Sequence, residues 1–351
     1  MNCSKLPNIS SDPLNFLNVD QKTNLLLEPV RVAEFSLDNN RRPVLGRSKA
    51  RYFYEPALGK GRKIPIKAKL SDGYNKDIIK EREDDGLIFL TRWISSMAPP
   101  NSILKEKIHD CDFVICRGTL LRLMTSCYDS IPHSVGMKLV CCKFKGVYFI
   151  REYYTPTRIE KEANMSDRHS RMCYEAHKFK VLVTTKGEGR KPDFREAVCV
   201  KPDFMGVFKA TIISPSHDPS ASFRLFYGAE IDCIMPSTGL YLGLKTQFKM
   251  LGFGQGFSDK GRLNQVELLD LSVLVNHLTM SGAKVACCFV FLYQFLQAVK
   301  NYLDMAPEGT ILLSERLPTS TEFNFKLFEE GSAEAAVYEV INNEFKSHGW
   351  L

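Results

Sequence analysis

Alternation of hydrophobic and polar positions along the chain predicts most of its strands. Residues 137–154 alternate on both sides of Lys145–Gly146, so we expect two paired strands that turn at this dipeptide. The apolar run VACCFVFLYQFL at 285–296 shows no alternation, and we interpret it as a buried strand. Strand-like patterns also occur at 28–38, 197–214, 222–235 and 238–248.

Helical spacing of hydrophobic and charged positions marks several other segments. Residues 78–97 place their Ile, Leu, Phe and Trp side chains at helical intervals, and residues 158–185 carry charges at that spacing, which predicts one long helix. Further helices are predicted at 101–109, within 113–129 and at 264–282. The mixture predicts one α/β (α+β) domain over 28–351, preceded by a loose polar segment at 1–27.

Composition narrows the class of protein. The 351 residues carry a formal net charge of +7, which permits nucleic-acid binding without demonstrating it. Eleven cysteines without a CxxC pair favour a reducing compartment and buried thiols over a zinc site. The polar start MNCSKLPNISSDPLNF and the short apolar runs predict an intracellular protein with no membrane partner.

The stretch GAEIDCIMPSTGLYLGLKTQFK suggests the remains of a nuclease site. Glu230 and Asp232 are two residues apart, so on a strand they would share a face. Lys245 follows on the next predicted strand, beside Gly243. Carboxylates on one strand and a lysine on the next are typical of metal-dependent nucleases. An acidic pair alone is more typical of a solvated strand face.

Several motifs together resemble the DXO family of RNA 5′-end decapping and quality-control exonucleases. They are EPVRVAEFSLD (28–38), ARYFYEP (50–56), SDGY (71–74), ICRGTLLRLM with Arg117, and Glu230-Ile231-Asp232. They occur in the family's order over about 28–320. The resemblance implies a DXO-like nuclease fold, with two packed mixed or antiparallel sheets flanked by helices. It also implies RNA 5′ ends as the substrate.

The departures from the family pattern concern its metal ligands. AHKFK replaces the family's glycine by Ala176 and its acidic ligand by Lys180, and Gly243 replaces another glutamate. Mg²⁺ prefers oxygen ligands, and an ammonium offers no acceptor. At 4 Å it would repel a cation by about 4 kcal/mol per unit charge, with an effective dielectric constant near 20. We therefore expect a catalytically inactive member without a cofactor.

Basic residues then become the candidates for binding. Arg117, Lys180 and Lys245 would contact the phosphates of an RNA 5′ end, whereas Glu230 and Asp232 are weak candidates for Mg²⁺ or Mn²⁺. The Gly-rich stretch 252–256 lacks the Lys-Ser/Thr of a phosphate-binding loop and favours a plain loop. Two alternatives stay open: an active 5′-end pyrophosphohydrolase or decapping nuclease with an altered metal site, and a pure protein scaffold.

Loss of metal ligands on an otherwise complete scaffold resembles the fly germline member of this family. That resemblance implies a nuclear protein in a chromatin-tethered complex at heterochromatic piRNA source loci. There it would suppress 5′-end processing, splicing and transcription termination. Active relatives imply a nuclear 5′-to-3′ exoribonuclease as a further partner.

Overall fold

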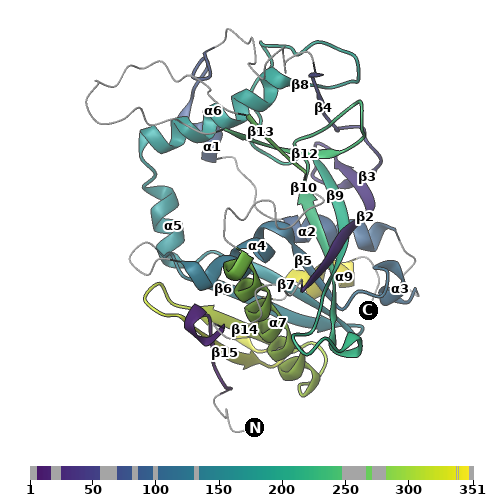
Figure 1. Ribbon diagram of the computed structural model, residues 1–351, viewed down its shortest axis with the longest axis vertical. Helices are drawn as coiled ribbons and strands as arrows, with labels where there is room; N and C mark the ends of the chain where they lie inside the picture. The colour runs from purple at the N-terminus through teal and green to yellow at the C-terminus, as the bar shows by residue number, and fades with distance from the viewer. Residues whose placement is uncertain are drawn as a thin grey trace.

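The computed structural model describes residues 6–16, 25–55, 69–80, 86–97, 102–129, 134–246, 266–270, 282–336, 338 and 340–347. Within these residues, two β-sheets and their flanking helices confirm the mixed α/β class (Figure 1). None of the helices in this described part combines the length and apolar character needed to cross a membrane.

The larger sheet has ten strands in the order β1-β15-β14-β6-β7-β5-β10-β9-β2-β3. The pairs β7–β5 and β5–β10 are parallel, and every other pair is antiparallel. The strands are β1 (Ile9–Ser10), β2 (Leu26–Leu37), β3 (Pro43–Leu45), β5 (Phe113–Cys116), β6 (Met137–Phe144), β7 (Val147–Tyr153), β9 (Phe204–Ile212), β10 (Phe223–Glu230), β14 (Ile311–Arg316) and β15 (Glu322–Phe328).

Helices cover both faces of this sheet because alternate side chains of its strands point to opposite sides. In β5, Phe113 and Ile115 belong to a core that includes α4 (Arg117–Thr125) and α7 (Gly282–Asp304). Val114 belongs to a second core on the other face. That core includes α2 (Gly86–Ser96), α3 (Leu104–Lys107) and α9 (Val340–Ser347).

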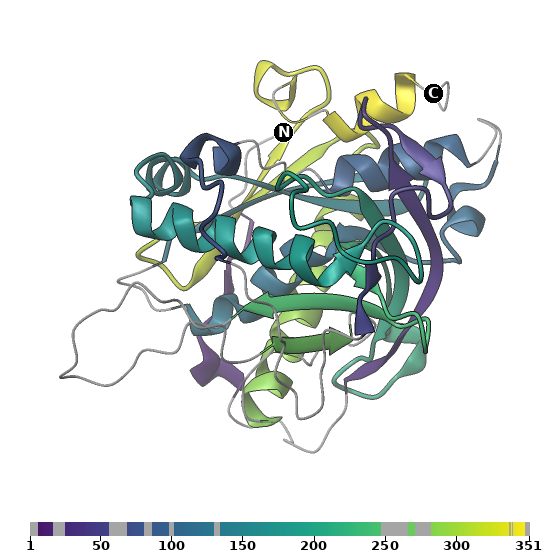
Figure 2. The same cartoon turned by 90° about the horizontal axis from the view of Figure 1, so that it is seen from above.

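The smaller sheet has five strands in the order β13-β12-β11-β4-β8. They are β4 (Tyr52–Phe53), β8 (Thr184–Thr185), β11 (Cys233–Ile234), β12 (Tyr241–Thr246) and β13 (Val266–Asp270). Helix α6 (Asp167–Val183) packs on this sheet, and Figure 2 shows it running alongside the strands. Phe179 and Val183 of α6 form a separate small core with Phe53, Leu242 and Leu244.

Short elements complete the chain: helices α1 (Lys76–Lys80), α5 (Pro156–Ala163) and α8 (Ala333–Ala336), with single 3₁₀ turns at 13–16, 126–128 and 219–221. Part of the N-terminal segment that the sequence predicts to be loose is held in place. β1 pairs with β15, and the Tyr302 hydroxyl donates to the Pro7 carbonyl at 2.7 Å.

The predicted pair of strands at 137–154 is confirmed as β6 and β7, with the turn at Lys145 and Gly146. Other predictions were wrong. The run 285–296 lies inside the 23-residue helix α7, because an apolar run of this length suits a buried helix as well as a strand.

The segment 158–185 is two helices rather than one. α5 ends at Ala163, and α6 begins after Ser166, whose hydroxyl accepts the amide hydrogen of His169. The helix predicted at 264–282 contains strand β13 instead. The remainder of that helix and the stretch 252–256 lie outside the described residues.

The segment 222–235 is also divided, and this division creates the site. Glu230 ends β10 in the larger sheet, and Cys233 begins β11 in the smaller one. The hairpin partner of β12 is therefore β11, not the strand that carries Glu230.

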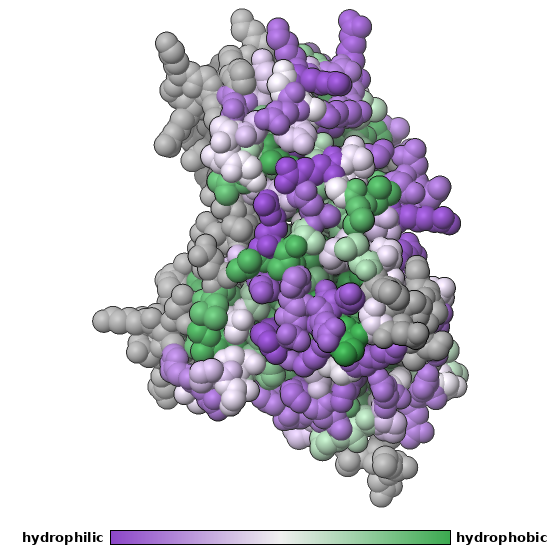
Figure 3. Space-filling model, turned by 90° about the vertical axis from the view of Figure 1, so that its right-hand side faces the viewer, coloured by the Kyte–Doolittle hydropathy of each residue, from purple (hydrophilic) through white to green (hydrophobic). Residues whose placement is uncertain are grey.

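Polar side chains cover most of the molecular face seen from the side of β2 and β3, with hydrophobic side chains in separate patches (Figure 3). Leu27 and Val30 of β2 and Val44 and Leu45 of β3 are exposed apolar residues. Isolated exposed apolar residues are common on soluble proteins and do not by themselves mark a binding surface.

Candidate functional site

The site lies where the chain passes from one sheet to the other, beside the end of α6. Glu230 is the last residue of β10, and Asp232 lies in the two-residue link to β11. Lys180 is in the last turn of α6. We call these three residues the Lys180 site. Lys180 and the two carboxylates come from different elements, so only the folding of the chain brings them together.

The Lys180 ammonium contacts both carboxylates. It forms a short ion pair with Asp232 and lies 3.6 Å from Oε1 of Glu230. The Asp232 side chain is 9% exposed and that of Lys180 21%, whereas the Glu230 side chain is 46% exposed. The contact with Asp232 is therefore the shielded one, and the contact with Glu230 is open to solvent screening.

The electrostatics of the site keep Lys180 charged. Burial lowers the pKa of its ammonium, but Asp232 and Glu230 raise it more, and the result lies above the ordinary value of a lysine. The two carboxylates therefore face a fixed cation. The Lys180 ammonium thus supplies the positive charge that a pair of carboxylates would otherwise obtain by binding a metal ion.

Asp232 is held from a second side by β12. Its Oδ2 accepts the backbone amide hydrogen of Leu244 at 2.6 Å. The neighbouring Gly243 is thereby close to the Lys180 site. Lys245 pairs through its backbone with Glu267 of β13, and its side chain lies outside the described residues.

A divalent metal does not fit the groups that are present. Asp232 is already bound by an ammonium and an amide, and Glu230 is the other carboxylate of the Lys180 site. Among the residues that the structure describes, no three His, Cys, Asp or Glu side chains are grouped to hold a metal ion. A lysine supplies a positive charge at this place but no ligand.

Arg117 is the first residue of α4, and among the described residues no hydrogen bond or ion pair joins it to the Lys180 site. Its Nε and Nη2 are buried and have no hydrogen-bond partner among the residues that the structure describes, and the same holds for the hydroxyl of Tyr227. Burial lowers the pKa of the Arg117 guanidinium, against the influence of Tyr227, Cys116 and Asp232. A buried arginine with unused donors is costly, which makes it a candidate for binding an anion.

A cavity of about 550 Å³ opens beside Lys180 and the acidic pair. Its wall includes Arg51, which forms a two-pronged ion pair with Glu196 at 2.7 and 3.1 Å and donates to Thr184 at 2.6 Å. The cavity lining holds five Lys or Arg and four Asp or Glu side chains. The motif ARYFYEP contains Arg51, but spacing alone gave no sign that Glu196 would meet it.

The fold places this chain in a class of nucleases. Residues 27–256 match the family model described as "RAI1 like PD-(D/E)XK nuclease". The chain belongs to this RAI1-like nuclease family.

Curated relatives carry decapping functions in their names. The chain is 30% identical over 228 residues to decapping nuclease dom-3 of Caenorhabditis elegans, covering 64% of this chain and 55% of that protein. It is 27% identical over 333 residues to the decapping and exoribonuclease protein of Xenopus laevis, covering 91% and 75%. The chain thus spans about half the length of the worm relative.

Solved structures show the same fold. Rai1 of Scheffersomyces stipitis, in complex with (3′-NADP)⁺ and calcium ion, is 15% identical with a TM-score of 0.67, over 98% of this chain and 99% of that one. Rai1 of Candida albicans, in complex with pU5-Mn²⁺, is 13% identical with a TM-score of 0.64, over 97% and 100%. At these identities the likeness concerns the fold.

Proposed function

We propose that this chain is a catalytically inactive member of the family that binds RNA 5′ ends without a metal ion. The observation that carries the proposal is the position of the Lys180 ammonium between Asp232 and Glu230. Phosphodiester hydrolysis of the metal-dependent kind needs an ion to activate water and to stabilise the developing charge. Lys180 can neutralise charge, but it cannot generate a metal-bound hydroxide.

A site that has lost catalysis can still bind RNA, because binding depends on basic side chains and catalysis on a metal ion. A phosphate that reached the start of α4 would supply the partner that the buried donors of Arg117 lack among the described residues. Lys180 and Lys245 would add positive charge, and the 550 Å³ cavity offers space for part of a nucleotide. Rai1 of C. albicans in complex with pU5-Mn²⁺ supports a role for RNA in this fold.

The hydrolysis test uses RNAs with a 5′ triphosphate, a 5′ monophosphate or an unmethylated cap, each with Mg²⁺ or Mn²⁺. We expect no turnover, alongside a positive control with an active decapping exonuclease. Turnover that Asp232→Ala abolishes would overturn the proposal and favour an enzyme with an altered metal site.

The binding test measures affinity for the same RNAs without metal. Charge reversal of Arg117, Lys180 and Lys245 should weaken binding more than tenfold, because each removes one attraction and adds one repulsion. Reversal of Lys107, an exposed lysine on α3, is the matched control. Unchanged RNA binding after reversal of the three site residues would favour the scaffold interpretation.

The cellular part of the proposal rests on the degenerate site and the family alone. We propose a nuclear protein that acts in a chromatin-tethered complex at heterochromatic piRNA source loci, where it shields 5′ ends and suppresses splicing and termination. A nuclear 5′-to-3′ exoribonuclease is the further proposed partner. Depletion should increase splicing and termination of transcripts from these loci, and a cytoplasmic location of the tagged protein would contradict the proposal.

A further inference from the structure

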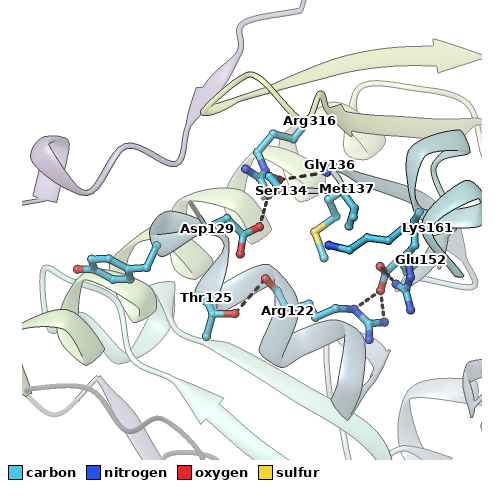
Figure 4. A pocket seen from close by; sticks show the side chains of 12 residues that line it. Arg122, Thr125, Asp129, Ser134, Gly136, Met137, Glu152, Lys161 and Arg316 are labelled. Atoms are coloured by element: carbon cyan, nitrogen blue, oxygen red, sulfur yellow. Dashed lines mark hydrogen bonds and ion pairs between the residues drawn. The ribbon is translucent and has the colours of Figure 1, made fainter. Parts of the chain in front are cut away.

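A second cavity, of about 350 Å³, lies at the opposite end of α4 from Arg117 (Figure 4). It shares no lining residue with the cavity beside Lys180. Its wall brings together the end of α4, the segment before β6, the end of β7, helix α5 and the end of β14. Four segments between α4 and α5 thus meet the distant end of β14 at one small cavity.

The charges around this cavity are unequal. Arg122 and Arg158 both pair with Glu152, whose side chain is 7% exposed. Arg316 pairs with Asp129. Lys161 has no ion pair or hydrogen bond with the described residues. The lining carries four basic and two acidic side chains, and Arg158 also pairs at 2.9 Å with Glu162 just outside the lining, which leaves a local excess of one positive charge at Lys161.

Several hydrogen-bond donors at the cavity have no acceptor within the described part of the chain. Lys161 extends toward Met137 across the opening, with its ammonium unbound (Figure 4). The hydroxyl of Ser134 accepts from Gly136 at 3.1 Å and from Arg316 at 3.4 Å, so its own hydrogen is left to donate. The Arg316 side chain is 2% exposed, and its Nε is buried without a partner.

Burial fixes the orientation of Arg316, which lines the cavity. Arg316 donates from Nη1 to the carbonyl of Ser320 at 3.3 Å, and its guanidinium lies 5.8 Å from the ring centre of Phe323. Its orientation is therefore set before any ligand arrives. A preformed guanidinium beside a free ammonium and a free hydroxyl is the donor set that recognises the oxygens of a phosphate or similar anion.

We propose that this cavity binds the dianion of a phosphate monoester. Lys161, the basic lining residue without a carboxylate partner among the described residues, would meet the charge of the phosphate, and the terminal oxygens would accept from Lys161, Ser134 and the arginines. A volume of about 350 Å³ is at the lower end of small-ligand sites, which span about 300–1,000 Å³. The site therefore accommodates a mononucleotide or one terminal nucleotide, and not several nucleotides of a nucleic acid.

The experiment compares three probes by isothermal titration calorimetry: AMP, inorganic phosphate and adenosine. The full chain should bind AMP and phosphate but not adenosine. Lys161→Glu should weaken AMP binding at least tenfold, because it replaces an attractive charge by a repulsive one. Lys161 is exposed and without a partner, so this substitution should leave folding intact. Lys107→Glu is the matched control and should leave AMP affinity within about twofold.

Further variants separate this cavity from the Lys180 site. Arg117→Met and Lys180→Met should leave the AMP binding that depends on Lys161 within about twofold, whatever they do to RNA or to a second AMP at the Lys180 site. AMP binding that is lost in Arg117→Met and kept in Lys161→Glu would place the ligand at the Lys180 site and overturn the inference. Equal affinity for AMP and adenosine would overturn it as well.

A 5′-phosphorylated oligonucleotide identifies the source of the phosphate. If it displaces AMP and its own affinity falls in Lys161→Glu, the cavity receives the terminal phosphate of a nucleic acid. If it does not displace AMP, the cavity receives a free nucleotide. Both results support a phosphate site, whereas failure of AMP and phosphate to bind the wild-type chain at about 1 mM would refute it.

Discussion

The ammonium of Lys180 is bound to one carboxylate oxygen of Asp232, while the other oxygen of the same carboxylate accepts the amide hydrogen of Leu244 at 2.6 Å. Asp232 is thus fully engaged by groups of the chain itself. The carboxylate connects the end of α6 to β12 of the smaller sheet. These contacts have consequences for stability.

Lys180 and Asp232 should be strongly coupled in their contribution to the free energy of unfolding. A double-mutant cycle with Lys180→Met and Asp232→Asn should give a coupling energy of about 1–3 kcal/mol, because both side chains are largely shielded from water. The matched cycle with Glu230→Gln should give less than about 1 kcal/mol, since Glu230 is 46% exposed and 3.6 Å away. Equal coupling energies from the two urea-unfolding cycles would contradict this assignment.

Local signals predicted much of the fold. The turn between β6 and β7 was predictable because Lys145–Gly146 separates two alternating stretches. Both residues adopt positive φ, as a tight hairpin turn requires. Helix α7 was missed because its 285–296 run is apolar on all sides and has no period to measure. The break between α5 and α6 had a weak signal in Ser166, a residue type favoured at helix starts.

The site was predictable only in part. Comparison of the sequence with the family's motifs singled out Lys180, Glu230 and Asp232, and the structure brings these three together. No local pattern could show that the chain changes sheets between Glu230 and Cys233, or that Leu244 would bind Asp232. These contacts depend on long-range packing. The positions of Glu196 and Arg316 in their cavities have the same origin.

Restoring the missing carboxylates should restore affinity for metal ions. The double variant Lys180→Glu with Gly243→Glu removes the resident cation and offers four carboxylates around residue 232. We expect its Mn²⁺ affinity, measured by calorimetry, to exceed that of the wild-type chain at least tenfold.

The control for this restoration is Lys180→Gln with Gly243→Gln, which has similar side-chain volumes but adds no charge. Near-ultraviolet circular dichroism should show that both variants keep the native packing. If the two double variants bind Mn²⁺ equally well, residues 180 and 243 do not surround a common metal position.

Above neutral pH, the stability that Lys180 contributes should change only in the alkaline range. Asp232 and Glu230 raise the pKa of its ammonium in the folded chain against the lowering effect of burial. A raised folded pKa gives stability that is complete below the unfolded pKa of about 10.4 and is lost as pH rises through the folded pKa. The difference in unfolding free energy between wild type and Lys180→Met should be constant from about pH 7 to 9.5 and shrink above about pH 10.5. A decline already complete by about pH 9 would show that the ammonium is not stabilised as described.

Replacing Arg117 by methionine should separate stability from binding. Nε and Nη2 of this arginine are buried without partners among the described residues, so Arg117→Met should leave the unfolding free energy unchanged or raise it by about 1 kcal/mol. The same variant should bind 5′-monophosphorylated RNA at least tenfold more weakly, because the unused donors are the ones that a phosphate would satisfy. Arg224→Met is the control: Arg224 is half exposed, pairs only loosely with Asp112 at 4.0 Å, and should affect neither quantity by much. A marked loss of stability in Arg117→Met with RNA affinity retained would show that this arginine supports the fold and not the ligand.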